Sequence, residues 1–165
     1  MTITQKPFEA DLLDQLLKRN HSQKNIIFSP TSLRLAFELA RRGAQGKTAE
    51  EIQEVFTLND ERLKAYQRYF VEQEKLGVNF DIANSVWVDR SFKFQKKFLK
   101  SVTENLHADS KEFDRMKAEE SAKNVNQWVS GKTNHMIQNL ITSDFIKPET
   151  RAILVNAISV SYTHL

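Results

Sequence analysis

The stretch from Asn25 to Leu58 constrains the fold of this chain more than any other part of it. It opens with a short apolar run that ends at Phe28, which is typical of a strand. Ser29 then stands where a helix N-cap is expected, and Pro30 occupies the first helical position, where a missing N–H removes no helical hydrogen bond. The stretch therefore predicts a strand that leads directly into a capped helix.

The helix predicted after Pro30 has two distinct faces. Its apolar residues recur at the spacing i, i+3, i+4 and i+7, which favours one buried stripe, and its charged residues lie mostly on the other side. We expect Gly43 to end this helix as a left-handed residue. The apolar stripe consists of Leu33, Ala36, Phe37 and Ala40, and the charged side consists of Arg34, Glu38, Arg41 and Arg42.

A second helix is predicted shortly after this glycine. Thr48 is followed three residues later by Glu51, which is the pattern of a capping box at a helix start. Ile52, Val55 and Phe56 are spaced as the buried side of that helix. The whole stretch thus predicts a strand, a helix, a tight turn and another helix.

The rest of the chain mixes helical and strand patterns. Residues 78–89 alternate with period two, which predicts a long strand, and because Trp87 lies on its less apolar side we expect both sides to be covered. Residues 152–158 are apolar almost throughout, as in a strand buried on both faces. Further helices are predicted over 7–19, 59–75, 93–106 and 118–132, with a short edge strand over 109–113. The fold class is therefore α+β with a mainly antiparallel sheet.

Two asparagines interrupt the apolar positions of these strands. Asn84 lies on the apolar side of the first strand, and Asn156 lies inside the second. A buried amide without a hydrogen-bond partner is costly, so we expect each of them to be bound to a specific neighbour.

Composition excludes several classes of protein. The chain has 165 residues, 40% hydrophobic and 27% charged, which suits one soluble globular domain with a sizeable core. A net charge of +3 is too small to indicate nucleic-acid binding. No apolar run reaches membrane-spanning length, and no secretory signal is visible at the N-terminus. The chain has no cysteines, which excludes disulfides and thiolate metal sites.

No motif indicates an enzyme. The segment from Gly43 to Thr48 ends in GKT like a phosphate-binding P-loop, but its glycines are too close together and a helix precedes it. No serine stands in a nucleophile elbow, and the histidines are not paired at metal-ligand spacing, so we expect no catalytic, cofactor or metal site. In the helix over 59–75, basic residues alternate with glutamates, which favours a solvated face over a polysaccharide site. The four histidines are His21, His107, His135 and His164.

Two segments of the chain resemble one family, the serpins, which are inhibitors of serine proteases. The first is NIIFSP with Ser32 and Leu33, followed by GAQGKTAEEI. The second is NVNQWVSGKTNHMI (124–137), followed by LVNAI (154–158). Both segments stand in the family's order, and the resemblance covers nearly the whole chain.

This resemblance implies a fold and a polar site. The fold would be a serpin-like multi-helix domain packed on a large, mainly antiparallel sheet, with residues 1–165 forming a single partial domain truncated before the C-terminal half. In serpins, positions like Ser29, Ser32 and Asn156 form the shutter, a polar cluster beneath the sheet where strands part to admit another strand. The alternative is that Ser29 only caps a helix and that the other two side chains have ordinary structural partners. The bait loop and its reactive-centre bond would belong to the C-terminal half, absent from this chain.

The resemblance also implies a function. The complete protein would inhibit a serine (or cysteine) protease as a suicide substrate, through cleavage of the bait loop and its insertion into the sheet, and this chain alone could not do so. The alternative is a non-inhibitory serpin, or an interaction module that binds a protein through an exposed sheet edge. The family points to the extracellular space, whereas the lack of a visible signal peptide leaves the cytoplasm open. We expect no nucleic-acid or membrane partner.

Overall fold

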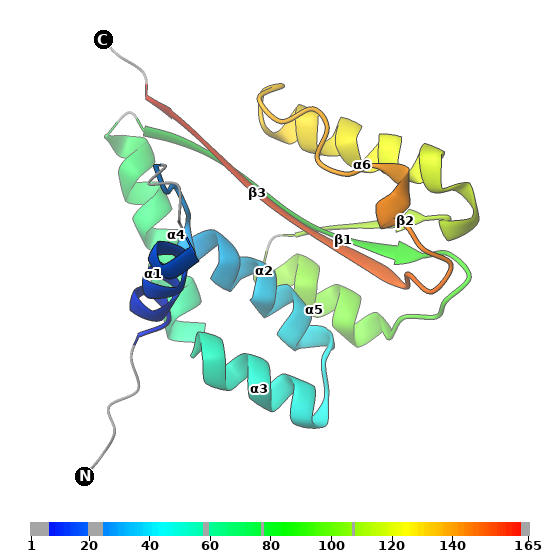
Figure 1. The fold of residues 1–165 in the computed structure, drawn as a ribbon, viewed down its shortest axis with the longest axis horizontal. Coiled ribbons are helices and arrows are strands. Elements are labelled where there is room, and N and C mark those ends of the chain that lie inside the picture. The colour runs from blue at the N-terminus through cyan, green and yellow to red at the C-terminus, as the bar shows by residue number, and fades with distance from the viewer. Residues whose placement is uncertain (1–6, 20–24, 58–59, 77, 107, 163–165) are drawn as a thin grey trace.

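The computed structural model describes residues 7–19, 25–57, 60–76, 78–106 and 108–162. Their fold combines helices with one sheet, which confirms the predicted α+β class (Figure 1). The helices are α1 (Phe8–Arg19), α2 (Pro30–Gly43), α3 (Gly46–Phe56), α4 (Asp60–Lys75), α5 (Lys96–Leu106) and α6 (Ala118–Lys132), with 3-10 turns η1 (Arg115–Lys117) and η2 (Ser143–Phe145). The strands are β1 (Val78–Asp89), β2 (Asp109–Phe113) and β3 (Ala152–Tyr162).

The sheet has the strand order β2-β1-β3 within the described residues. β1 and β3 run antiparallel along almost their whole length, from Val78 opposite Tyr162 to Val88 opposite Ala152. β2 is short and pairs with β1 in parallel, from Ser85 opposite Asp109 onward. The sheet is therefore mixed, and its longer pairing is the antiparallel one.

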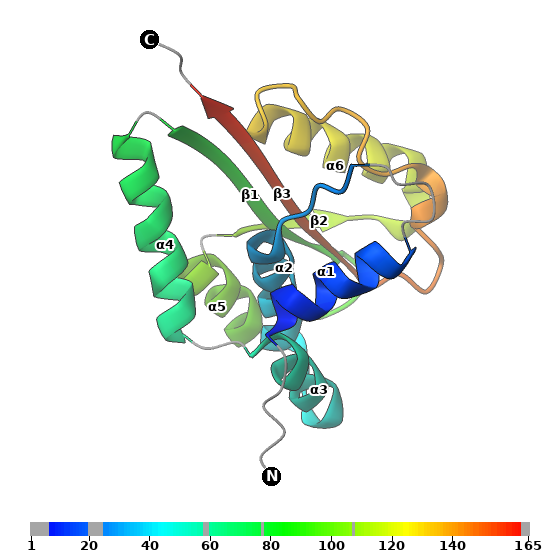
Figure 2. The ribbon, with the colours of Figure 1, turned by 60° about the vertical axis from the view of Figure 1, so that its left-hand side comes forward.

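Helices cover both faces of the sheet around β1. On one face, Trp87 packs with α6 residues such as Val125, which confirms that the side of β1 carrying this tryptophan is covered. On the other face, Val86 packs with Leu39 of α2 and Val102 of α5. Figure 2 shows α6 on one side of the strands, and α2 and α5 on the other. Burying a valine fully contributes about 1.5–3 kcal/mol, so these contacts fix both layers.

The strand predicted before α2 is wrong, because residues 25–28 form no strand, whereas the start of α2 forms as its sequence predicts. Ser29 is the N-cap, and its Oγ accepts a hydrogen bond from the backbone N–H of Ser32 at 3.2 Å. Pro30 is the first helical residue. This cap fixes the place of the first turn of α2 beneath the sheet.

α2 ends at Gly43, as predicted, but the predicted conformation of this glycine and the predicted cap of α3 are wrong. Gly43 does not adopt a left-handed conformation; the positive φ of 54° belongs to Gly46, where α3 begins. The absence of a side chain at Gly43 instead allows close packing, because a Cβ there would lie 3.1 Å from the ring of Phe98. Thr48 is not a cap either, since it lies in the first turn of α3 and the N-cap is Gln45, which makes no side-chain cap bond.

The faces of α2 and α3 also differ from the predicted ones. Arg34 and Glu38 are buried, whereas Leu33 and Phe37 remain 36% and 38% exposed. In α3, Phe56 is buried as predicted, but Val55 is exposed.

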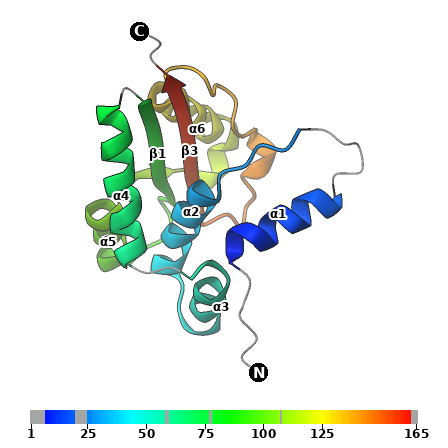
Figure 3. The ribbon, with the colours of Figure 1, turned by 90° about the vertical axis from the view of Figure 1, so that its left-hand side faces the viewer.

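Arg34 and Glu38 of α2 can be buried because each forms an ion pair. Nη2 of Arg34 lies 2.8 Å from Oε1 of Glu9 in α1. The carboxylate of Glu38 lies 2.7 Å from Nε of Arg41 and 2.6 Å from Nε of Arg42. Figure 3 shows α1 beside α2 and α3, apart from the sheet. The partner of Arg34 lies on another helix, which periodicity within α2 cannot reveal, whereas the partners of Glu38 lie three and four residues further along α2 itself.

Candidate functional site

A chain of amide and hydroxyl side chains joins α2 to both long strands. Asn156 of β3 lies opposite Asn84 of β1, and its Nδ2 donates to the Oδ1 of Asn84 at 2.6 Å. The Oγ of Ser32, in the first turn of α2, donates to the Oδ1 of Asn156. The structure therefore brings together two of the three site residues predicted from sequence, and both asparagines have the partners expected of them.

Ser29, the third predicted residue, is connected to this chain only indirectly. Its Oγ caps α2 by accepting from the backbone N–H of Ser32, whose own hydroxyl donates to Asn156. Removing the cap would loosen the turn that presents Ser32 to the sheet. We name Ser32, Asn84 and Asn156 the amide cluster.

The amide cluster can form more hydrogen bonds than those found among the described residues. An asparagine amide carries two donor hydrogens and an oxygen with two lone pairs. Within the described part of the chain, Asn156 uses one hydrogen toward Asn84 and one lone pair toward Ser32. The remaining groups could bind a further strand, and a network of this kind can rearrange its partners.

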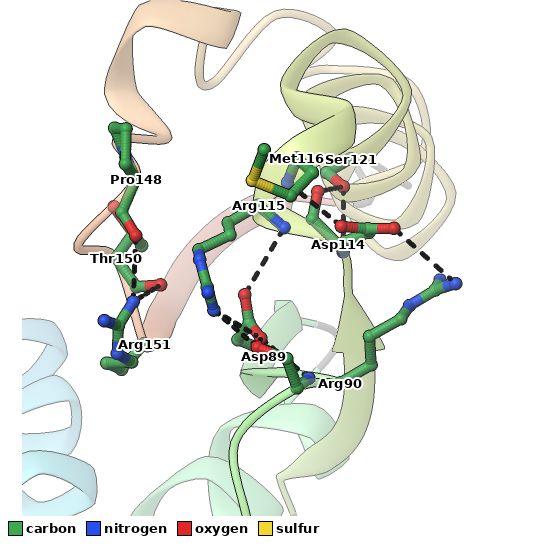
Figure 4. Close-up of polar contacts among 10 residues, drawn as sticks. Asp89, Arg90, Asp114, Arg115, Met116, Ser121, Pro148, Thr150 and Arg151 are labelled. Carbon is green, nitrogen blue, oxygen red and sulfur yellow. Dashed lines mark hydrogen bonds and ion pairs between the residues drawn. The ribbon is translucent and has the colours of Figure 1, made fainter.

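A second polar cluster, which the sequence did not reveal, lies where β1 ends (Figure 4). The carboxylate of Asp89 is 1% exposed and forms an ion pair with Nη1 of Arg115 at 3.0 Å. It also accepts from the backbone N–H of Ser91 at 2.8 Å. Burial raises the pKa of Asp89, but hydrogen bonds from Ser91 and Arg115 outweigh it, so this pKa lies below its ordinary value. The only sequence signal was an aspartate at the end of a strand.

The described residues contain neither a candidate metal site nor a candidate membrane-spanning helix. They contain no group of three or more histidine, cysteine or carboxylate side chains that could hold a metal ion. In that same part of the chain, no helix has the length and apolarity needed to cross a membrane. His135 contacts Ser130 at 2.9 Å, while His21, His107 and His164 lie outside the described residues.

A family model and the related proteins identify the same family. The family model for Serpin (serine protease inhibitor) matches residues 4–161. Human Serpin B9 is 35% identical over 156 residues, which cover 92% of this chain and 41% of that protein. A leukocyte elastase inhibitor from Xenopus tropicalis is 32% identical over 157 residues, again covering 92% of this chain and 41% of the relative.

Solved structures agree with this match. A cleaved Serpin 42Da superimposes with a TM-score of 0.77 at 25% identity, covering 92% of this chain and 41% of that one. Emu ovalbumin (Dromaius novaehollandiae) gives a TM-score of 0.83 at 20% identity, covering 94% of this chain and 45% of that one, which shows likeness of fold alone. The chain spans about two fifths of the length of the curated relatives named above.

Proposed function

Because the chain belongs to the serpin family, we propose that it forms the N-terminal part of a protein that inhibits a serine (or cysteine) protease. The protease cleaves a bait loop supplied by the rest of the protein and becomes acyl-linked to it. The cleaved loop then inserts into the sheet as a new strand and carries the protease with it. Such an inhibitor is consumed in the reaction and does not turn over.

The observation that carries this proposal is the position of the amide cluster next to an available strand edge. Among the described residues β3 pairs with β1 alone, so its other edge can accept an additional strand. Asn156 lies in the middle of β3, and its two bonds to described residues do not use the full hydrogen-bonding capacity of its amide. An inserted strand would gain backbone hydrogen bonds along this edge, as in other cases of strand addition.

We assign the shutter role to Ser29, Ser32 and Asn156 on this basis. Ser29 fixes the first turn of α2, Ser32 ties that turn to β3, and Asn156 ties β3 to β1. Asn84 joins this set as the acceptor on β1. The four residues would hold the strands together until insertion and then exchange partners.

The proposal is tested by reading the transcript beyond the codon for Leu165 and expressing the protein that the complete frame encodes. Limited cleavage of its bait loop should raise the temperature of unfolding sharply, because an inserted strand adds hydrogen bonds and buried area. An uncleavable control, with proline at the cleaved position, should show no such rise. An unchanged unfolding temperature after complete cleavage would contradict loop insertion.

A second candidate is an interaction module that binds a protein through the edge of β3. It is favoured by Leu154, which is 39% exposed near the start of this strand. An exposed, regular edge can pair with an extended segment of another chain. A partner that binds the 165-residue chain, and loses binding when Leu154 is replaced by lysine, would favour this function over inhibition.

A further inference from the structure

A cavity of about 580 Å³ lies next to the start of β3. Its wall is formed by the end of α2, the start of α3, residues 92–98 and the start of β3. Figure 1 shows the end of α2 and the start of α5 near the start of β3. Small-molecule sites in proteins measure roughly 300–1,000 Å³, so the cavity has room for a ligand. We name it the α2–α5 cavity.

The wall of the α2–α5 cavity is largely apolar. Leu39 is buried and packs in one cluster with Phe94 and Phe98, whose ring centroids lie 6.2 Å apart. Phe92 and Leu154 also line the cavity, yet they are 51% and 39% exposed. An apolar ligand in the cavity would remove these two side chains from water, which is favourable in proportion to the area covered.

Small residues at the end of α2 leave this space open. Ala40, Gly43 and Ala44 all line the cavity. Ala44 follows the helix as its C-cap in an extended conformation, with φ of −81° and ψ of 155°. That conformation is accessible to residues with large side chains, so a larger residue at this position would fill the cavity without straining the backbone.

The charged residues that line the cavity are both positive. They are Arg42 and Lys93, and the described lining residues include no carboxylate. Nε of Arg42 lies 2.6 Å from Oε1 of the buried Glu38, and its Nη1 donates to Oγ of Ser101 in α5 at 3.3 Å. Because Glu38 offsets the charge of Arg42 and these bonds fix its guanidinium in the wall, Lys93 is the better partner for a ligand. Lys93 is exposed, and its flexible stem lets the ammonium meet an anionic group at the mouth of the cavity.

We infer that the α2–α5 cavity binds an alkyl carboxylate. The alkyl chain lies in the cavity against Phe94 and Phe98, and the carboxylate pairs with the ammonium of Lys93. Charge selects the ligand, since an alkylammonium of the same length would meet Lys93 with repulsion. This site goes beyond the proposed function and does not depend on loop insertion.

The site is tested by isothermal titration of the 165-residue chain with octanoate, decanoate and dodecanoate. Each added methylene that enters the cavity should tighten binding about fourfold. Decylammonium should bind more weakly than decanoate. Binding that does not depend on chain length, or equal affinity for the two charges, would overturn the site.

A charge reversal separates the head group from the chain. Lys93→Glu should weaken binding of decanoate and tighten binding of decylammonium, each by about threefold or more, because an attraction becomes a repulsion. Lys97→Glu makes the same charge change at an exposed residue outside the cavity wall and is the matched control. Equal effects of Lys93→Glu and Lys97→Glu would overturn the role of Lys93.

Filling the cavity tests its location. Ala40→Phe should abolish binding of all three carboxylates, and Ala44→Phe provides a second filled variant if the first disturbs α2, which circular dichroism would show. Ala65→Phe, at an exposed position of α4, is the control and should bind like the native chain. Undiminished binding in a folded variant with a filled cavity would overturn the site.

Two other occupants of the cavity would be recognised in the same experiments. A dimer of the native chain that is lost in both filled variants would place a second copy in the cavity. Binding by the 165-residue chain that disappears in the protein translated from the complete reading frame would show that its remaining residues fill the space. Either result would overturn the ligand site.

Discussion

Replacement of Asn156 by alanine should destabilise the chain measurably, because it removes two hydrogen bonds at once. The variant loses the donor to Asn84 and the acceptor for Ser32. Each neutral hydrogen bond contributes about 1 kcal/mol, so the expected loss is about 2 kcal/mol. For a domain of this size, that lowers the midpoint of thermal unfolding by about 4–8 °C.

The assay is thermal unfolding followed by circular dichroism, with Asn139→Ala as the control. Asn139 lies on the surface of the segment after α6, so its replacement should change the midpoint very little. Equal midpoints for Asn139→Ala and Asn156→Ala would refute the assigned contacts.

A double-mutant cycle isolates the bond between α2 and β3. Ser32→Ala and Asn156→Ala should each destabilise the chain, and their combination should cost about 1 kcal/mol less than the sum, because both remove the same bond. Strict additivity would show that Ser32 and Asn156 do not interact, and the amide cluster would then lose its connection to the helix.

Three further variants test individual features of the fold. Thr57 ends α3 with a φ of 48°, so Thr57→Gly should stabilise the chain by about 0.5–1 kcal/mol in urea unfolding, and a loss would contradict this. Asp89→Asn breaks a buried pair with Arg115 and should cost about 3 kcal/mol. The pKa of Asp89 in the folded chain lies below its ordinary value of 3.8. Its contribution to the free energy of unfolding should therefore be present above about pH 4 and be lost as the pH falls further. Between about pH 6 and about pH 2.5, the unfolding midpoint should fall more for the native chain than for Asp89→Asn. Glu38→Gln should lower the thermal midpoint, because Arg41 loses a buried carboxylate, and an unchanged midpoint would argue against that pair.

Much of the fold could be predicted from sequence because its signals are local. The alternation over 78–89 gave both ends of β1, and the helical spacing over 118–132 gave α6. Ser29 and Pro30 marked the start of α2 because capping involves residues within one turn. Asn84 and Asn156 were expected to find partners, since an amide in an apolar strand must be satisfied.

The parts that could not be predicted depend on contacts distant in sequence. Arg34 is buried because Glu9 of a different helix neutralises it, and no pattern within α2 carries that information. Gly43 correctly marked the end of α2, but the sequence did not show that it also leaves room for the ring of Phe98, which lies on α5. The cluster around Asp89 joins residues from two separate segments, so no single motif could have indicated it.

In the proposed function, this chain is part of an inhibitor that traps its protease by strand insertion. The most direct measurement is to incubate the protein translated from the complete reading frame with elastase-, chymotrypsin- and trypsin-like proteases and separate the products on a denaturing gel. We predict a band that contains both inhibitor and protease, resists the detergent and appears in proportion to the loss of protease activity. Full protease activity, with only the cleaved inhibitor visible, would contradict the claim for these proteases and favour the interaction module.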